Sequence, residues 1–188
     1  MKHLKTLALM LLLYPIAVWA ISNPIKILLP QTAGVVCAES WLCVEDIGRV
    51  AEARHLYINA LGNIERKLSP LDGKPLMVFC STQRCFERFG FDDESGQSIG
   101  GFGVVISPKG WQPHIVEHEL IHQWQVATFG VLDTWLAPRW ITEGMAYALS
   151  DDPRDVLPEP FQGYREKYLW NYAAVSKEKL PLALAGGF

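Results

Sequence analysis

Residues 114–124 read HIVEHELIHQW and contain three histidines and two glutamates. Pro113 precedes this segment and Gly130 follows it, and a proline in the first turn with a glycine after the last is typical of a helix. We therefore expect one helix between these two residues. His118 and His122 are four residues apart, so they project from nearly the same face of that helix, about one turn apart. Two imidazole nitrogens placed in this way can bind the same metal ion.

A metal site on this helix needs a third protein ligand, because a catalytic zinc ion is typically held by three side chains and keeps a fourth position for water. A second helix is expected over Arg139–Ser150, and Glu143 near its start can supply the third ligand if the two helices form a hairpin. Glu119 lies roughly 100° around the helix from His118. There it is beside the metal position, where a carboxylate can take a proton from activated water.

The motif HELIHQW, followed further along the chain by WITEGMA, resembles the gluzincin zinc peptidases, in particular their aminopeptidase-N-like branch. The resemblance covers Leu76 to Ser150. It implies one zinc ion per chain bound by His118, His122 and Glu143, with Glu119 as the general base. It also implies an α+β, zincin-like core in which a small β-sheet accompanies the active-site helix and the glutamate-bearing helix. Because 188 residues cannot hold the flanking domains of large aminopeptidases, the compact minigluzincin type is the closer comparison.

The chain departs from the family pattern in two places. No G-x-M-E-N segment precedes the histidines, and GGFGVV stands in its place, so recognition of a free substrate amino terminus is not expected. Tyr147, four residues past Glu143, occupies the position where thermolysin-like members carry an aspartate that orients a zinc histidine. We therefore expect different supporting residues around the ligands.

Several residues are candidates for such supporting roles. Tyr147 is one of them. His114 is one turn before the first ligand and could extend the site, although a histidine in the first turn of a helix is more often a surface residue. Tyr164, Arg165 and Tyr168 offer donors that could stabilise an oxyanion, and their spacing alone does not choose among them.

Each of these residues also has an ordinary structural interpretation. The histidine motif could be a solvated helix face, Glu143 a charge that interacts favourably with its helix dipole, and Glu117 a solvated residue. The tryptophans are expected in the core and between helices, since large aromatic side chains dominate such contacts. They are Trp124, Trp135 and Trp140.

Two functions from different classes follow from this site. The first is a zinc-dependent peptidase that hydrolyses peptide bonds of a peptide or protein substrate, using metal-activated water and a glutamate base. The second is a non-catalytic zincin-like module that binds a partner or has a structural role at the cell envelope. Glu119 favours the enzyme, because a structural zinc site has no need of a carboxylate at that position.

The amino terminus has the layout of a secretory signal, with Lys2 and Lys5 ahead of an apolar run from Leu7 to Trp19 and the small Ala20 behind it. This run is shorter than the roughly 18 to 20 apolar residues of a spanning helix, which favours a cleaved signal over a membrane anchor. We expect a periplasmic or extracellular protein, with an uncleaved anchor that tethers it to the membrane as the alternative. The expected organisation is a signal or anchor over 1–20, an exported segment with a local disulfide over 21–44, and the peptidase domain over 45–188.

Export determines how the four cysteines are interpreted. Cys37 and Cys43 lie in CAESWLC, and Cys80 and Cys85 lie in CSTQRC. Two local disulfides are the simplest arrangement in an oxidising compartment. A zinc cluster is the alternative, but the two-residue C-x2-C spacing that is typical of structural zinc sites is absent.

Composition limits the number of domains and the classes of partner that the chain can have. With 49% hydrophobic and 20% charged residues the chain can bury one ordinary core, so we expect a single catalytic or binding domain. The net charge is -3 and the chain has no long Lys/Arg run. The sequence therefore predicts no concentrated basic surface that could bind the phosphates of a nucleic acid. The remaining expected elements are a helix over 46–68, strands within 74–81 and 98–110, and a last helix over 164–180.

Overall fold

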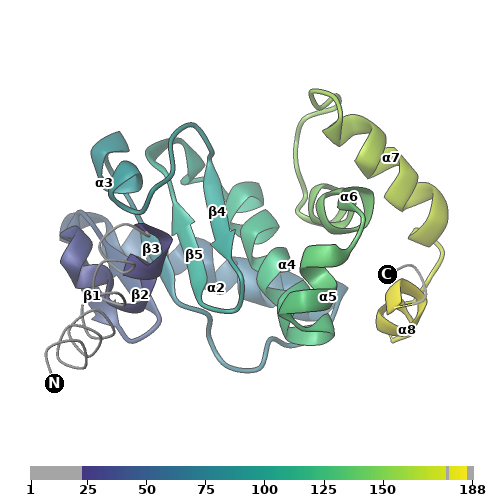
Figure 1. Ribbon diagram of the computed structural model, residues 1–188, viewed down its shortest axis with the longest axis horizontal. Helices are drawn as coiled ribbons and strands as arrows, with labels where there is room; N and C mark the ends of the chain where they lie inside the picture. Colours follow the sequence, from purple (N-terminus) through teal and green to yellow (C-terminus); the bar gives the residue numbers. More distant parts are fainter. Residues whose placement is uncertain (1–22, 177, 186–188) are drawn as a thin grey trace, which may run out of the picture.

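A mixed β-sheet lies beside a series of helices in the computed structural model, which describes residues 23–176 and 178–185 (Figure 1). The strands are β1 (Val36–Glu39), β2 (Leu42–Val44), β3 (Met77–Phe79), β4 (Gly96–Ile99) and β5 (Gly103–Ile106). Within the described residues the sheet has five strands in the order β1-β2-β3-β5-β4. The three central strands, β2, β3 and β5, are parallel, and β1 and β4 join the two edges in antiparallel pairing.

The three central strands are buried along their whole length, as expected for parallel strands that are covered on both faces. The strand expected within residues 98–110 is confirmed as β5, but β4, which pairs with it to form a hairpin, was not expected. Gly100, with φ 48°, lies in the turn of this hairpin. A Cβ atom at Gly103 would lie 2.4 Å from the carbonyl oxygen of Leu76, the residue before β3. Only glycine therefore fits at the start of β5.

Helices occupy most of the remaining described chain. They are η1 (Asn23–Leu28), η2 (Pro30–Ala33), η3 (Ile47–Arg49), α2 (Val50–Lys67), α3 (Gln83–Arg88), η4 (Pro108–Gly110), α4 (Pro113–Phe129), α5 (Val131–Leu136), α6 (Arg139–Leu149), α7 (Phe161–Tyr172) and α8 (Leu180–Ala185). The helices expected over 46–68, 113–129 and 139–150 are confirmed. The bounds of the last one are wrong: α7 starts directly after Pro160, and the chain turns after Tyr172 before α8 begins.

The helix α4 is central to the packing. It contacts α2, the β4–β5 hairpin and α6, and Figure 1 shows it between the sheet and the pair α6–α7. Its apolar side chains Val116, Leu120, Ile121 and Trp124 are all buried in the larger core cluster. Because neighbours cover α4 on several sides, the orientation of its histidine-bearing face is fixed by packing. A second, smaller cluster on the β1–α3 side includes Phe86.

Both expected disulfides are confirmed. Cys37–Cys43 joins β1 to β2, and Cys80–Cys85 joins the end of β3 to α3. A zinc cluster built from these cysteines is therefore ruled out. Two disulfides indicate folding in an oxidising, exported environment.

The amino-terminal expectations concern two different parts of the chain. The expected signal or anchor over 1–20 lies outside the described residues. The following segment, 21–44, supplies β1 and β2 to the sheet. Among the described residues, no helix combines the length and the apolar character that crossing a membrane requires.

Candidate metal centre

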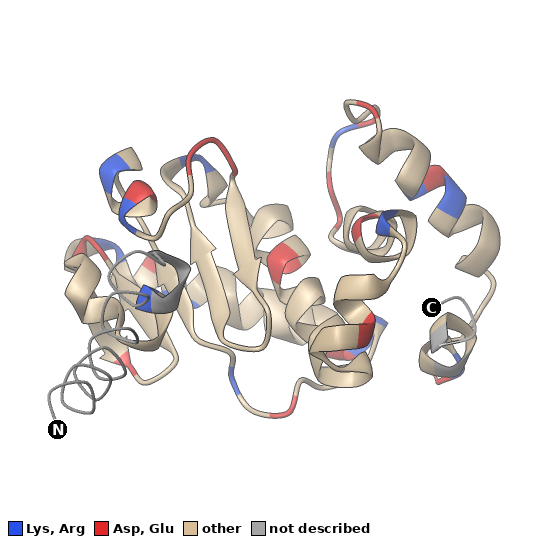
Figure 2. Ribbon diagram, in the orientation of Figure 1, with Lys and Arg blue, Asp and Glu red and all other residues tan. Residues whose placement is uncertain are grey.

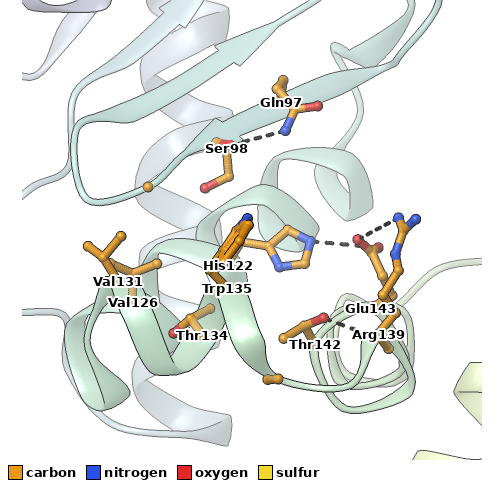
Figure 3. A pocket seen from close by; sticks show the side chains of 12 residues that line it. Gln97, Ser98, His122, Val126, Val131, Thr134, Trp135, Arg139, Thr142 and Glu143 are labelled. Carbon is orange, nitrogen blue, oxygen red and sulfur yellow. Dashed lines mark hydrogen bonds and ion pairs between the residues drawn. The ribbon is translucent and has the colours of Figure 1, made fainter.

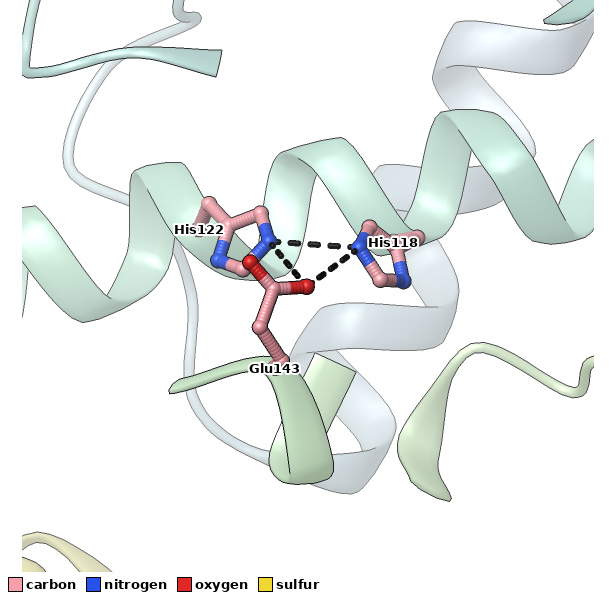
Figure 4. A group of neighbouring side chains, drawn as sticks. All are labelled: His118, His122 and Glu143. Atoms are coloured by element: carbon pink, nitrogen blue, oxygen red, sulfur yellow. Dashed lines mark hydrogen bonds and ion pairs between the residues drawn. The ribbon is translucent and has the colours of Figure 1, made fainter. Parts of the chain in front are cut away.

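His118 and His122 on α4 and Glu143 on α6 converge on one point (Figure 4). Nε2 of His118 lies 3.2 Å from Nε2 of His122. Oε2 of Glu143 lies 3.5 Å from the first of these nitrogens and 3.8 Å from the second. Each residue offers one ligand atom, and these atoms all lie within 4.8 Å of one another, so the group could hold a metal ion.

Gln125 determines which nitrogen of His122 faces the group. Its Oε1 lies 2.9 Å from Nδ1 of His122, while its Nε2 donates to the carbonyl of Thr142 at 2.9 Å. An amide that donates through nitrogen to Thr142 must accept through oxygen, so Nδ1 of His122 carries the proton. Nε2 then presents its lone pair to the position shared with His118 and Glu143, as a metal ligand must.

Glu143 is held as a carboxylate. Burial raises its pKa, but the interactions of the carboxylate with His118, His122 and Arg139 outweigh burial, so its pKa falls to about 2. Arg139, one turn earlier on α6, approaches the other carboxylate oxygen at 3.5 Å. The third expected ligand is therefore ionised at neutral pH.

Glu119 lies beside the three-residue group and is only 7% exposed. Burial raises the pKa of Glu119 to about 7, helped by Glu143, while His122 and a hydrogen bond from the backbone of Ser98 oppose the increase. The close approach of β4 explains this burial, because a Cβ atom on Gly96 would lie 2.7 Å from Cγ of Glu119. The carboxylate is thus enclosed between α4 and the edge strand, off the ligand face, as the sequence predicts.

Two adjoining cavities open on the group. The first, here called the α5 cavity, has a volume of about 400 Å³ and lies between β4, α4 and α5 (Figure 3). The second, here called the Arg154 cavity, has a volume of about 310 Å³ and lies against α6 and the loop that follows it. Four residues line both cavities: Gln97, His122, Arg139 and Glu143. The ligand group therefore lies where the two cavities meet.

Residues of the Arg154 cavity were not all predicted. Tyr147 lines it, and its ring packs against His118 with ring centroids 4.4 Å apart. Arg154 also lines it, held by Asp152 through a hydrogen bond from Nε at 2.9 Å and a second one from Nη2. The sequence carries no spacing signal for Arg154, because it lies in an irregular loop that only the fold brings back to the ligands. Acidic and basic positions are interspersed around this region (Figure 2).

The other candidate donors lie elsewhere. His114 is half-buried and is not part of the ligand group, and burial lowers its pKa. Tyr164 is not among the residues that line either cavity. Arg165 donates to the carbonyls of the loop at Arg154 and Asp155, and the packing of α7 buries Tyr168.

Two structural expectations near the site are wrong. Glu117 is not solvated but 1% exposed, because α2 covers that side of α4 and Lys67 donates to its carboxylate at 2.7 Å. Trp135 is not in the core but 78% exposed, because α5 contributes no buried residue. Trp124 is buried, and Trp140 stacks on Tyr172, as expected for packing residues.

Comparisons of the chain with protein-family models, with curated proteins and with solved structures found no match. The geometry places a group that could hold a metal ion on two adjacent helices, with the carboxylate of Glu119 beside it.

Proposed function

We propose that this chain is an exported, zinc-dependent peptidase with a zincin-like core of the gluzincin type. The observation that carries the proposal is the convergence of four side chains on the Arg154 cavity. His118, His122 and Glu143 supply three ligand atoms, and Glu119 supplies a carboxylate that is not needed as a ligand. A site that only holds a metal has no need of this fourth group.

The separations between the ligand atoms support zinc. Tetrahedral zinc with nitrogen or oxygen ligands at 2.0 to 2.2 Å requires about 3.4 Å between ligand atoms. The three separations in the group are 3.2, 3.5 and 3.8 Å. Two neutral imidazoles and one carboxylate are also a donor set found in catalytic zinc sites with a position left for water.

The residues around the ligands suit hydrolysis of an amide bond. When bound, zinc supplies a Lewis acid for the scissile carbonyl and lowers the pKa of water. Glu119 accepts the proton of the attacking water and passes it to the leaving amine. Arg154, oriented by Asp152, and Tyr147 line the same cavity as Glu119 and can donate to a developing oxyanion.

The sheet edge offers a place for the substrate backbone. Among the described residues, β4 pairs with β5 on one side only, and no strand pairs with its other edge. Gln97 on this strand lines both cavities, so the edge runs past the ligand group from one cavity to the other. An extended peptide can add to such an edge through main-chain hydrogen bonds, which places its backbone across the site.

The decisive experiment compares the wild type with Glu119→Gln. Both proteins are loaded with zinc, analysed for metal content and incubated with a broad peptide library. Both should hold one zinc per chain, and Glu119→Gln should cleave roughly 10² to 10⁴ times more slowly, the usual contribution of a general base. The matched control is Glu94→Gln, which neutralises another carboxylate of the Arg154 cavity and should change the rate only slightly.

Three outcomes contradict the proposal or part of it. Equal rates in wild type and Glu119→Gln at equal zinc content exclude Glu119 as the base. Stoichiometric zinc in His122→Ala excludes the ligand assignment. Full zinc content without cleavage of any library member by the wild type favours the non-catalytic binding module.

A further inference from the structure

The helix α5 exposes an unusual amount of apolar surface for its six residues. Four of its side chains are apolar and more than half exposed: Val131 at 58%, Leu132 at 65%, Trp135 at 78% and Leu136 at 64%. Apolar side chains that gather in this way at the mouth of a cavity are typical of a binding surface. None of them contributes to the buried core.

Only one face of α5 lines the cavity. Val131 and Trp135, four residues apart, line the α5 cavity together with Val126 of α4, whereas Leu132 and Leu136 do not. In Figure 3, Val126 and Val131 lie toward one end of this cavity, and His122 points toward Glu143 at the other end. The apolar wall therefore continues directly into the ligand group.

The position of α5 is tied to the ligand helix. Oγ1 of Thr134 donates to the carbonyl of Gln125 at 3.2 Å, and Gln125 also contacts the ring of His122. The apolar wall and the ligand are thus held by the same residue of α4. A subsite built in this way is preorganised relative to the reacting bond.

The two cavities differ in chemistry. The Arg154 cavity has the charged residues Glu94, Glu119 and Arg154 in addition to Arg139 and Glu143, which line both cavities. The α5 cavity has an apolar wall on the helix side and the polar residues Gln97 and Ser98 on the strand side. A peptide backbone on β4 would direct a side chain toward the apolar wall, and the volume of about 400 Å³ is within the usual range for ligand pockets.

We propose that the α5 cavity selects peptides by a large apolar or aromatic side chain next to the scissile bond, with Trp135 and Val131 as specificity-determining residues. This inference rests on the proposed peptidase function. It adds the substrate class, which the ligand group and Glu119 do not determine.

The test measures kcat/KM for a peptide series in which each position flanking the scissile bond is Phe, Leu, Ala or Asp. The wild type should prefer Phe and Leu over Ala at one position by about tenfold or more, since a methylene in an apolar pocket is worth roughly 10- to 200-fold. Trp135→Ala should lose most of this preference, because it should cleave the Phe and Leu peptides more slowly. Leu132→Ala is the matched control, because it removes another exposed apolar side chain of the same helix, one that does not line the cavity.

A binding measurement separates this inference from the function itself. Calorimetric titration of zinc-loaded Glu119→Gln with the same peptides should show tighter binding of the Phe peptide, and Trp135→Ala in that background should weaken it. Cleavage without apolar preference, or equal behaviour of Trp135→Ala and Leu132→Ala, overturns the subsite and leaves the peptidase intact. Selective binding without cleavage by the wild type supports the subsite and overturns the peptidase. If neither cleavage nor binding is observed, both the subsite and the peptidase function are overturned.

Discussion

Gln125 connects the two helices that carry the proposed metal ligands. It is 1% exposed, its oxygen faces Nδ1 of His122, and its nitrogen binds the carbonyl of Thr142, the residue before Glu143. A buried amide that loses either partner would leave an unsatisfied polar group, so both hydrogen bonds are maintained together. The ring of one ligand and the helix start of another are thus oriented by a single side chain.

We predict that Gln125→Ala lowers zinc affinity by about 10- to 100-fold, the usual effect of removing a residue that orients a metal ligand. Competition against a chromophoric chelator measures this affinity. Gln123→Ala is the control, because Gln123 is equally buried on α4 but donates to Ser98, Gly100 and Gly103 and to no ligand. Equal zinc affinity in the wild type and Gln125→Ala would contradict the orienting role.

At the scale of elements, α2 is linked to α4 and to the end of α6 through Lys67. Its Nζ donates to Oε1 of Glu117 at 2.7 Å and to the carbonyl of Leu149 at 2.6 Å, and it pairs with Asp151 at 2.8 Å. Asn63 donates to the second oxygen of Glu117 at 2.9 Å. Glu117 directly precedes His118, a proposed ligand, so this network holds the first turns of α4.

We predict that Lys67→Met lowers the free energy of unfolding by about 3 kcal/mol, because it leaves the buried carboxylate of Glu117 without its cation. Urea unfolding at pH 7 measures the loss. The double variant Lys67→Met/Glu117→Met should recover most of it, since the unpaired buried charge is then removed as well. A double variant that is as unstable as the single one would show that the loss is due to packing instead.

The elements differ in how far local sequence could predict them. The helices α2, α4 and α6 were predictable because apolar spacing, Pro113 and Gly130 are local signals. The β4–β5 hairpin was missed because Gly100 and Gly103 occur inside an apolar run, and only the neighbouring strand shows that they make a turn and a close approach.

The residues of the candidate site also fall into those that local sequence predicts and those that it does not. The HExxH spacing predicts that both histidines and Glu119 share one part of the helix because it follows helix geometry, and these residues line one cavity together with Glu143. Gln125, Gly96 and Arg154 were missed because their roles depend on which element packs against them.

At the scale of the whole molecule, two buried tyrosines link stability to alkaline pH. Tyr57 and Tyr168 are 0% and 2% exposed, and burial raises the pKa of both above the usual value for tyrosine. The hydroxyl of Tyr57 donates to the carbonyl of Pro75 at 2.7 Å, an interaction that requires the protonated form. In the unfolded chain both residues ionise near pH 10.

Above about pH 10 the unfolded chain therefore binds fewer protons than the folded one, and the free energy of unfolding falls as pH rises toward the folded pKa. Below that pH both tyrosines are protonated in both states, and their contribution is fully present. Each residue adds up to about 1.4 kcal/mol per pH unit to the slope. We predict that Tyr168→Phe, which keeps the ring in the core, reduces the loss of stability between pH 10 and 11 by about 1 kcal/mol, because this tyrosine is only about half ionised at pH 10 in the unfolded chain. Urea unfolding at pH 8, 9, 10 and 11 measures the loss. Identical slopes in the wild type and Tyr168→Phe would show that Tyr168 ionises as readily in the folded protein as in the unfolded chain.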